Sequence, residues 1–328
     1  MAGMIVPRYW AEGRIQDRRG GKQVTVRRWG WSDVGVAQAQ AHADERARGA
    51  LERIHAGEAL PRREPKVPYN GAEGVPIREE IVSTHGEVIV TRNSYGALCI
   101  NTPDVLFADV DFEERSLSCW AVLGVSLLGL AGGLALAPKH RLAWALATAF
   151  ACVALVSTAW RLFQRARSAA EGGREAQARA RIARFVDNHF GWKLRVYRTP
   201  AGLRVLAVHR RFDPTSPEVA DFFRQIGADP LYVRMCVRQR CFRARVSPKP
   251  WRIGISGHLK PRPGVWPVDP ARKPERDRWI AAYDAAAKGY ASCRFIETVG
   301  EGAKDPDAED VRALHDELSR AMSDLPLA

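Results

Sequence analysis

Two aspartates at the end of an apolar stretch are the residues whose spacing most clearly suggests chemistry. Asp109 and Asp111 stand in the run Val105–Phe112, whose other members are all apolar. Side chains alternate along a β-strand, so both carboxylates would lie on one face, close together. Neighbouring carboxylates repel unless a cation holds them, and Mg²⁺ or Mn²⁺ prefers such oxygen ligands. The alternative is a strand end with two solvated aspartates, and the pattern alone leaves both open.

A basic stretch in the second half of the chain suits an anionic ligand. No acidic residue occurs from Pro230 to Val268, and arginines and lysines there alternate with aromatic residues. Basic side chains interleaved with aromatics favour phosphate groups and stacked bases. A solvated basic face, or one that rests on anionic lipid head groups, is the alternative. The candidates for a shared phosphate-binding groove are Arg243, Arg245 and Lys249.

Three segments, in this order, resemble motifs of archaeo-eukaryotic primases and primase-polymerases. Residues 107–112 (Phe-Ala-Asp-Val-Asp-Phe) look like the first motif, a strand with acids for two divalent metals. Residues 199–205 (Thr-Pro-Ala-Gly-Leu-Arg-Val) resemble the second motif, which contacts nucleotide phosphate. Residues 228–232 and 241–249 look like the third acid and the basic strand-turn after it. The similarity covers about residues 97–112 and 197–252.

The resemblance implies metal-dependent nucleotide binding and nucleotidyl transfer. Asp109, Asp111 and Asp229 would be catalytic and would hold Mg²⁺ or Mn²⁺. Residue 204 departs from the motif, because an arginine replaces the histidine and cannot shuttle a proton near neutral pH. His209 could substitute for it, or could be a structural hydrogen-bonding residue. The expected phosphate contacts are Thr199, Gly202, Arg204, His209, Arg243, Arg245, Ser247 and Lys249.

Two long apolar segments interrupt the region between the first and second motifs. Residues 116–138 and 142–160 carry no charge, and Lys139, His140 and Arg141 separate them. A bilayer core needs about 20 apolar helical residues, so we expect a transmembrane helical hairpin. Gly129 and Gly133 form a small-xxx-small pair that would let the two helices approach closely. Two buried helices of a soluble core are the alternative.

The distribution of arginines predicts the orientation of this hairpin. Arg161, Arg165, Arg167, Arg174 and Arg179 follow the second segment, and such a basic flank stays cytoplasmic. Two spans return the chain to the side from which it came. We therefore expect a multi-pass membrane protein with two transmembrane helices, both termini cytoplasmic and a short outer turn. The first 20 residues lack an apolar stretch, so the hairpin would be its own insertion signal.

Charge and cysteine content narrow the partners and the compartment. A formal charge of +13 suits nucleic acid, nucleotide or anionic lipid head groups. The six cysteines show no CxxC spacing, so we expect reduced thiols. The sequence shows no P-loop, Rossmann glycine motif, zinc cluster or Ser-His-Asp set.

The remaining pattern predicts an α+β fold, mostly antiparallel sheet with flanking helices, plus the hairpin. The expected parts are residues 1–115 with a helix and a β-meander, the hairpin at 116–160, and an Arg-rich helix followed by an α/β segment at 161–328. Strands are expected at 23–29, 80–83, 87–91, 97–101, 105–112, 192–197, 203–209, 241–246 and 291–298. Helices are expected at 33–56, 161–188, 217–226, 231–237, 274–288 and 309–322.

Two functions fit these observations. The first is a membrane protein with a basic, primase-like cytoplasmic domain that binds nucleotide or nucleic acid and can transfer nucleotides with a divalent metal. The second is a non-catalytic membrane protein whose basic domain binds anionic lipid or a protein partner. They differ in whether Asp109, Asp111 and Asp229 lie close enough to share a cation.

Overall fold

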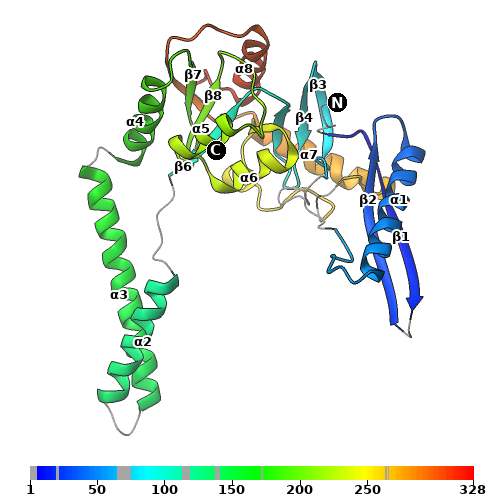
Figure 1. The fold of residues 1–328 in the computed structure, drawn as a ribbon. Coiled ribbons are helices and arrows are strands. Elements are labelled where there is room, and N and C mark those ends of the chain that lie inside the picture. The colour runs from blue at the N-terminus through cyan, green and yellow to red at the C-terminus, as the bar shows by residue number, and fades with distance from the viewer. Residues whose placement is uncertain are drawn as a thin grey trace. The chain divides into compact units, whose positions relative to one another are not determined.

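The chain forms two units, and the second lies in the sequence between two parts of the first. In this computed structural model the described residues are 6–19, 22–64, 75–112, 119–136, 141–170, 173–262, 264 and 266–328. The first unit comprises residues 1–110 and 182–328, and the second comprises residues 111–181. Figure 1 shows both strands and helices in the first unit and long helices in the second. The predicted α+β class with antiparallel sheets is confirmed.

The N-terminal part of the first unit is a hairpin covered by one helix. β1 (Tyr9–Arg19) pairs antiparallel with β2 (Lys22–Ser32), and α1 (Val36–His55) packs against both strands. Gly13 and Gly30 face α1, and a Cβ at either position would collide with the helix backbone at Ala43. The absence of side chains at these two positions therefore allows close helix–strand packing.

Two features of this part differ from the sequence prediction. β1 was not predicted, because its many polar residues do not give the pattern expected of a strand. It is stabilised by pairing with β2 along its whole length. The helix predicted at 33–56 begins only at Val36. Ser32 is still paired with Tyr9 as the last residue of β2, and its hydroxyl accepts a hydrogen bond from the Val34 amide at 3.0 Å.

One four-stranded sheet joins distant parts of the first unit. Its strands are β3 (Glu80–His85), β4 (Val88–Arg92), β5 (Leu98–Thr102) and β9 (Phe242–Arg245), in the order β3-β4-β5-β9. All three pairings are antiparallel. The predicted meander is confirmed for its first three strands, while the free edge of β5 is taken by β9.

The second four-stranded sheet carries the predicted acidic strand. Its strands are β6 (Phe107–Asp111), β7 (Leu194–Arg198), β8 (Gly202–Ala207) and β10 (Arg294–Val299), in the order β10-β7-β8-β6. The prediction that β6 continues the meander is wrong. Because β9 occupies the edge of β5, β6 does not pair with β5 and lies beside β8 instead. The chain turns away after Thr102, whose hydroxyl accepts a hydrogen bond from the Val105 amide at 3.2 Å.

Helices surround these sheets and bury an aromatic core. The helices are α4 (Gly173–Asp187), α5 (Pro217–Ile226), α6 (Pro230–Gln239), α7 (Lys273–Ala287) and α8 (Pro306–Ser319), with 3₁₀ turns at Pro250–Arg252 and Pro270–Arg272. Phe185 at the end of α4 contacts the rings of Trp192 and Phe222. Ser216 caps α5 by accepting a hydrogen bond from the Val219 amide, and Gly227 ends it in a left-handed conformation.

The second unit contains a helical hairpin formed by α2 (Cys119–Leu136) and α3 (Arg141–Ala170). The predicted Gly129–Gly133 pair lies on the contact surface, because a Cβ at Gly129 would lie 2.5 Å from the Ala149 Cα and one at Gly133 would meet Ala145. Thr148 donates a hydrogen bond to the Gly129 carbonyl at 2.6 Å. Small residues thus bring the two helices together as expected.

The prediction of two membrane spans is borne out only in part. In the described residues one stretch, Leu142–Trp160, is long and apolar enough to cross a membrane, while the apolar part of α2, Val122–Leu134, is shorter. The predicted turn at Lys139 lies outside the described residues.

Candidate functional site

The predicted metal ligand Asp109 lies in β6 and is held by an arginine of the neighbouring strand β8. Arg204 donates hydrogen bonds from Nε to Asp109 Oδ1 at 2.8 Å and from Nη2 to Oδ2 at 3.0 Å. Its third nitrogen donates to the Arg245 carbonyl at 2.7 Å. Burial opposes the charge of Arg204, but the Asp109 carboxylate offsets this and raises the pKa of Arg204 above its ordinary value. Both carboxylate oxygens of Asp109 are therefore engaged by a buried guanidinium.

Asp229 lies next to Asp109 through its backbone, but its carboxylate has another role. The Asp229 amide donates a hydrogen bond to the Asp109 carbonyl at 2.9 Å. The Asp229 side chain caps α6 by accepting hydrogen bonds from the amides of Leu231 at 3.0 Å and Tyr232 at 3.3 Å. An N-cap aspartate satisfies amides that a helix leaves unpaired, which fully accounts for an acid at this position.

The third predicted ligand, Asp111, is the exposed last residue of β6 and belongs to the second unit. Within the described residues, no group of three or more His, Cys, Asp and Glu side chains is arranged to hold a metal ion. Because Arg204 engages Asp109 and α6 engages Asp229, the three aspartates in this arrangement do not fit a shared Mg²⁺ or Mn²⁺ site.

The residues of the second motif form a tight turn between β7 and β8. Thr199 accepts a hydrogen bond from the Gly202 amide through its hydroxyl at 3.0 Å, and its own amide donates to the Gly202 carbonyl at 2.9 Å. His209 contacts the Lys193 carbonyl through Nδ1 at 3.3 Å and packs on Trp192. Burial lowers the pKa of His209. Both the threonine and the histidine thus contribute to local structure.

The predicted phosphate-binding residues do not share one solvent-facing groove. Arg243 is buried and forms an ion pair with Glu79, which is equally buried and also accepts a hydrogen bond from Thr91 at 2.7 Å. The hydroxyl of Ser247 accepts from the Leu98 amide at 2.7 Å and contacts the Tyr283 hydroxyl at 2.6 Å. These side chains already have partners within the protein.

Arg245 and Lys249 are half-buried. Arg245 donates a hydrogen bond from Nη1 to the Ser247 carbonyl at 2.6 Å, and Lys249 Nζ lies 5.5 Å from the ring centroid of Trp251. Trp251 is itself 49% exposed and contacts the rings of Tyr95 and His258. An exposed aromatic ring beside a lysine is the part of the predicted groove that remains suited to a stacked base.

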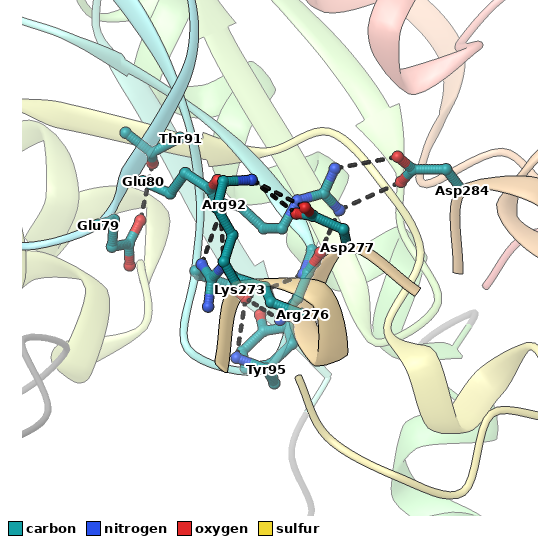
Figure 2. A network of polar contacts seen from close by, with 12 residues as sticks. Glu79, Glu80, Thr91, Arg92, Tyr95, Lys273, Arg276, Asp277 and Asp284 are labelled. Carbon is teal, nitrogen blue, oxygen red and sulfur yellow. Dashed lines mark hydrogen bonds and ion pairs between the residues drawn. The ribbon is translucent and has the colours of Figure 1, made fainter. Parts of the chain in front are cut away.

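A second group of ion pairs, which sequence reasoning missed, joins the β3–β4 region to α7. Arg92 contacts both carboxylate oxygens of Asp284 at 3.1 Å, and Arg276 is paired with Glu80 at 2.7 Å. Figure 2 shows both pairs. The partners lie almost 200 residues apart in the sequence, so no local spacing pattern could have shown them.

A buried thiol, imidazole and carboxylate also lie together. Cys293 Sγ is 3.8 Å from His315 Nε2, and His315 Nδ1 is 3.1 Å from Asp316 Oδ1. Burial raises the pKa of Cys293, but His315 and Arg204 offset this, and the net shift is downward. Such a group resembles the arrangement of a cysteine nucleophile. Cys293 and His315 are both fully buried, however, so no substrate reaches the thiol.

The first unit also has a pocket of about 430 Å³ with an acidic rim. Arg211 lies in it and contacts three carboxylates, those of Glu87, Asp104 and Asp307. The single guanidinium offsets one of these three carboxylates, so the lining of the pocket keeps a net negative charge. The pocket is lined by His85, Gly86, Glu87, Val88, Thr102, Asp104, Val105, Arg211, Asp307, Asp310, Val311 and Leu314.

Comparisons of the chain with protein-family models, with curated proteins and with solved structures gave no match. The primase resemblance therefore depends on the sequence motifs alone and stays a prediction.

Proposed function

We propose that this protein is anchored in a membrane by the α2–α3 hairpin and carries its α+β unit on the cytoplasmic side. The observation that carries the proposal is the apolar outer surface of α3. Only 11% of the stretch Leu142–Trp160 is buried, and Phe150 is 79% exposed. A core helix of a soluble protein would be mostly buried, whereas lipid solvates such a surface well.

The sheet topology supports an even number of crossings. β6 precedes the hairpin and β8 follows it, yet the two strands are neighbours in one sheet. β5 and β9, which also flank the hairpin in the sequence, pair in the other sheet. A sheet cannot form across a bilayer, so the chain before and after the hairpin must lie on the same side. The shorter apolar helix α2 would then complete the second crossing, aided by uncharged residues on both sides of it.

The orientation follows from the arginines after Trp160, which favour the cytoplasm. The test is labelling of intact cells with a membrane-impermeant maleimide. Lys139→Cys in the outer turn should react, while the exposed Arg48→Cys of α1 should react only after permeabilisation. The parent chain measures the background of its own cysteines. If Arg48→Cys alone reacts in intact cells, the orientation is reversed, and recovery of intact protein in the soluble fraction refutes the anchor.

We further infer that the α+β unit is a binding module for an anionic partner. The Asp109–Arg204 pair favours a binding module over a metal-dependent enzyme, because a bidentate arginine and a divalent cation compete for the same two oxygens. Metal-dependent nucleotidyl transfer would require Arg204 to leave this carboxylate and Asp229 to leave the α6 amides. Of the chain's formal charge of +13, residues 111–181 carry +4 (nine basic and five acidic residues), so the α+β unit carries the remaining +9, which favours anions.

A further inference from the structure

One surface of the first unit has an unusual mixture of exposed side chains, namely the outer face of α6. We define this face by Leu231, Arg234, Val237 and Arg238, which are all exposed. Leu231 is 51% exposed and Val237 is 46% exposed. The opposite side of α6 is buried through Tyr232, Met235, Cys236 and Gln239.

The helix that presents this face is firmly placed. Asp229 caps its first turn, and the Tyr232 hydroxyl donates a hydrogen bond to the Phe107 carbonyl at 2.8 Å. Two positions, 234 and 238, are one turn apart, so their guanidinium groups lie on the same side of the helix. Neither arginine has an ion-pair partner in the part of the chain that the structure describes. No acidic residue occurs from Pro230 to Val268 that could neutralise them locally.

We propose that the outer face of α6 docks on the anionic head groups of the membrane that holds the hairpin. This inference rests on the proposed membrane anchor. Seven residues, 112–118, lie between the end of β6 at Asp111 and the start of α2 at Cys119. Even fully extended, this connection reaches about 30 Å, so the end of β6 stays within that distance of the start of α2. This tether gives the α+β unit a high effective concentration at the lipid surface, so weak contacts are enough for docking.

The composition of the face favours lipid over nucleic acid. Arginines can bind phosphate in either partner, but Leu231 and Val237 would have no apolar partner on a nucleic acid backbone. At a membrane interface these side chains enter the boundary between head groups and acyl chains while the arginines stay at the phosphates. The face has no aromatic ring on which a base could stack.

The experiment compares hydrogen exchange of residues 230–240 in the full-length protein reconstituted into phosphatidylcholine nanodiscs with and without phosphatidylglycerol. Two arginines near an anionic surface should slow exchange in the anionic discs by about five- to thirtyfold. High salt should remove the effect. The variant Arg234→Gln with Arg238→Gln should exchange at the same rate in both lipids.

A matched control removes two exposed arginines elsewhere. Arg14→Gln with Arg278→Gln lowers the net charge by the same amount and should keep the protection of α6. Leu231→Ala with Val237→Ala should lose part of it. If α6 of the parent exchanges at the same rate in both lipids, docking is overturned while the anchor stays intact. Docking is also overturned if the control variant loses as much protection as Arg234→Gln with Arg238→Gln.

The same assay distinguishes the other partners. Protection of α6 by an oligonucleotide in neutral discs, without protection by phosphatidylglycerol, would overturn the lipid assignment in favour of nucleic acid. Failure of the parent chain to remain with the discs on flotation would refute the anchor, and the docking inference with it.

Discussion

The Asp109–Arg204 pair makes a sharp prediction, because its two side chains differ in exposure. The side chain of Arg204 is 3% exposed and that of Asp109 is 30% exposed. Asp109→Ala would leave a buried guanidinium without its counter-charge, which costs about 3–5 kcal/mol of unfolding free energy. Arg204→Met keeps the apolar stem and leaves a carboxylate that water can reach, so we expect a loss of only about 1–3 kcal/mol.

The double variant completes the test. Asp109→Ala with Arg204→Met removes both charges and should lose less stability than the sum of the two single losses, by at least about 1 kcal/mol. The assay is urea unfolding of the full-length protein in micelles, followed by near-UV circular dichroism, since urea does not screen the pair. Additive losses, or a larger loss for Arg204→Met than for Asp109→Ala, would refute the paired arrangement and leave Asp109 free to bind a cation.

Three further predictions follow from geometry and burial. Gly129→Val should lower the thermal stability of the hairpin, by about 1–3 kcal/mol in helix packing, whereas Gly124→Val should not, because a Cβ there meets nothing within 4 Å. Burial raises the pKa of Cys241 from 9.0 to about 12, so the unfolded state alone releases this proton above pH 9. The free energy of unfolding should therefore fall as the pH rises from 9 to 12, by up to about 1.4 kcal/mol per pH unit. Urea titrations at each pH should show a steeper fall for the parent than for Cys241→Ala. Millimolar Mn²⁺ with nucleotide should leave the melting temperature of the parent unchanged, while a shift that is lost in Asp109→Asn with Asp111→Asn would support nucleotidyl-transfer chemistry.

Local patterns in the sequence predicted the elements of this fold better than their partners. The strand at residues 105–112, the helix at 217–226 and the apolar hairpin were correctly located, because alternation, capping residues and charge-free runs are local signals. The placement of β6 beside β8 was not predictable, since it depends on β9 filling the edge of β5 from a distant part of the chain.

In the candidate site, too, the sequence shows the residues but not their partners. Asp109 and Asp229 are joined by a backbone hydrogen bond, but an acid that binds metal and one that caps a helix are alike in a sequence. What distinguishes them is the partner, here Arg204 for one and the α6 amides for the other. The described cysteines Cys99, Cys152, Cys236, Cys241 and Cys293 form no disulfide in the structure.

The insertion of the hairpin between neighbouring strands constrains how the protein is made. When the ribosome has completed β5 and β6, their partners β9 and β8 do not yet exist, so two strand edges stay open while the hairpin is synthesised. If the hairpin spans the membrane as we propose, α2 packed on the first part of α3 shortens the free chain between β6 and β8 roughly twofold. The logarithmic law for loop closure gives a saving of about 0.6 kcal/mol in chain entropy. Membrane insertion would thus precede completion of the sheets and assist it, and nascent chains arrested before residue 202 should bind chaperones at the open edges of β5 and β6.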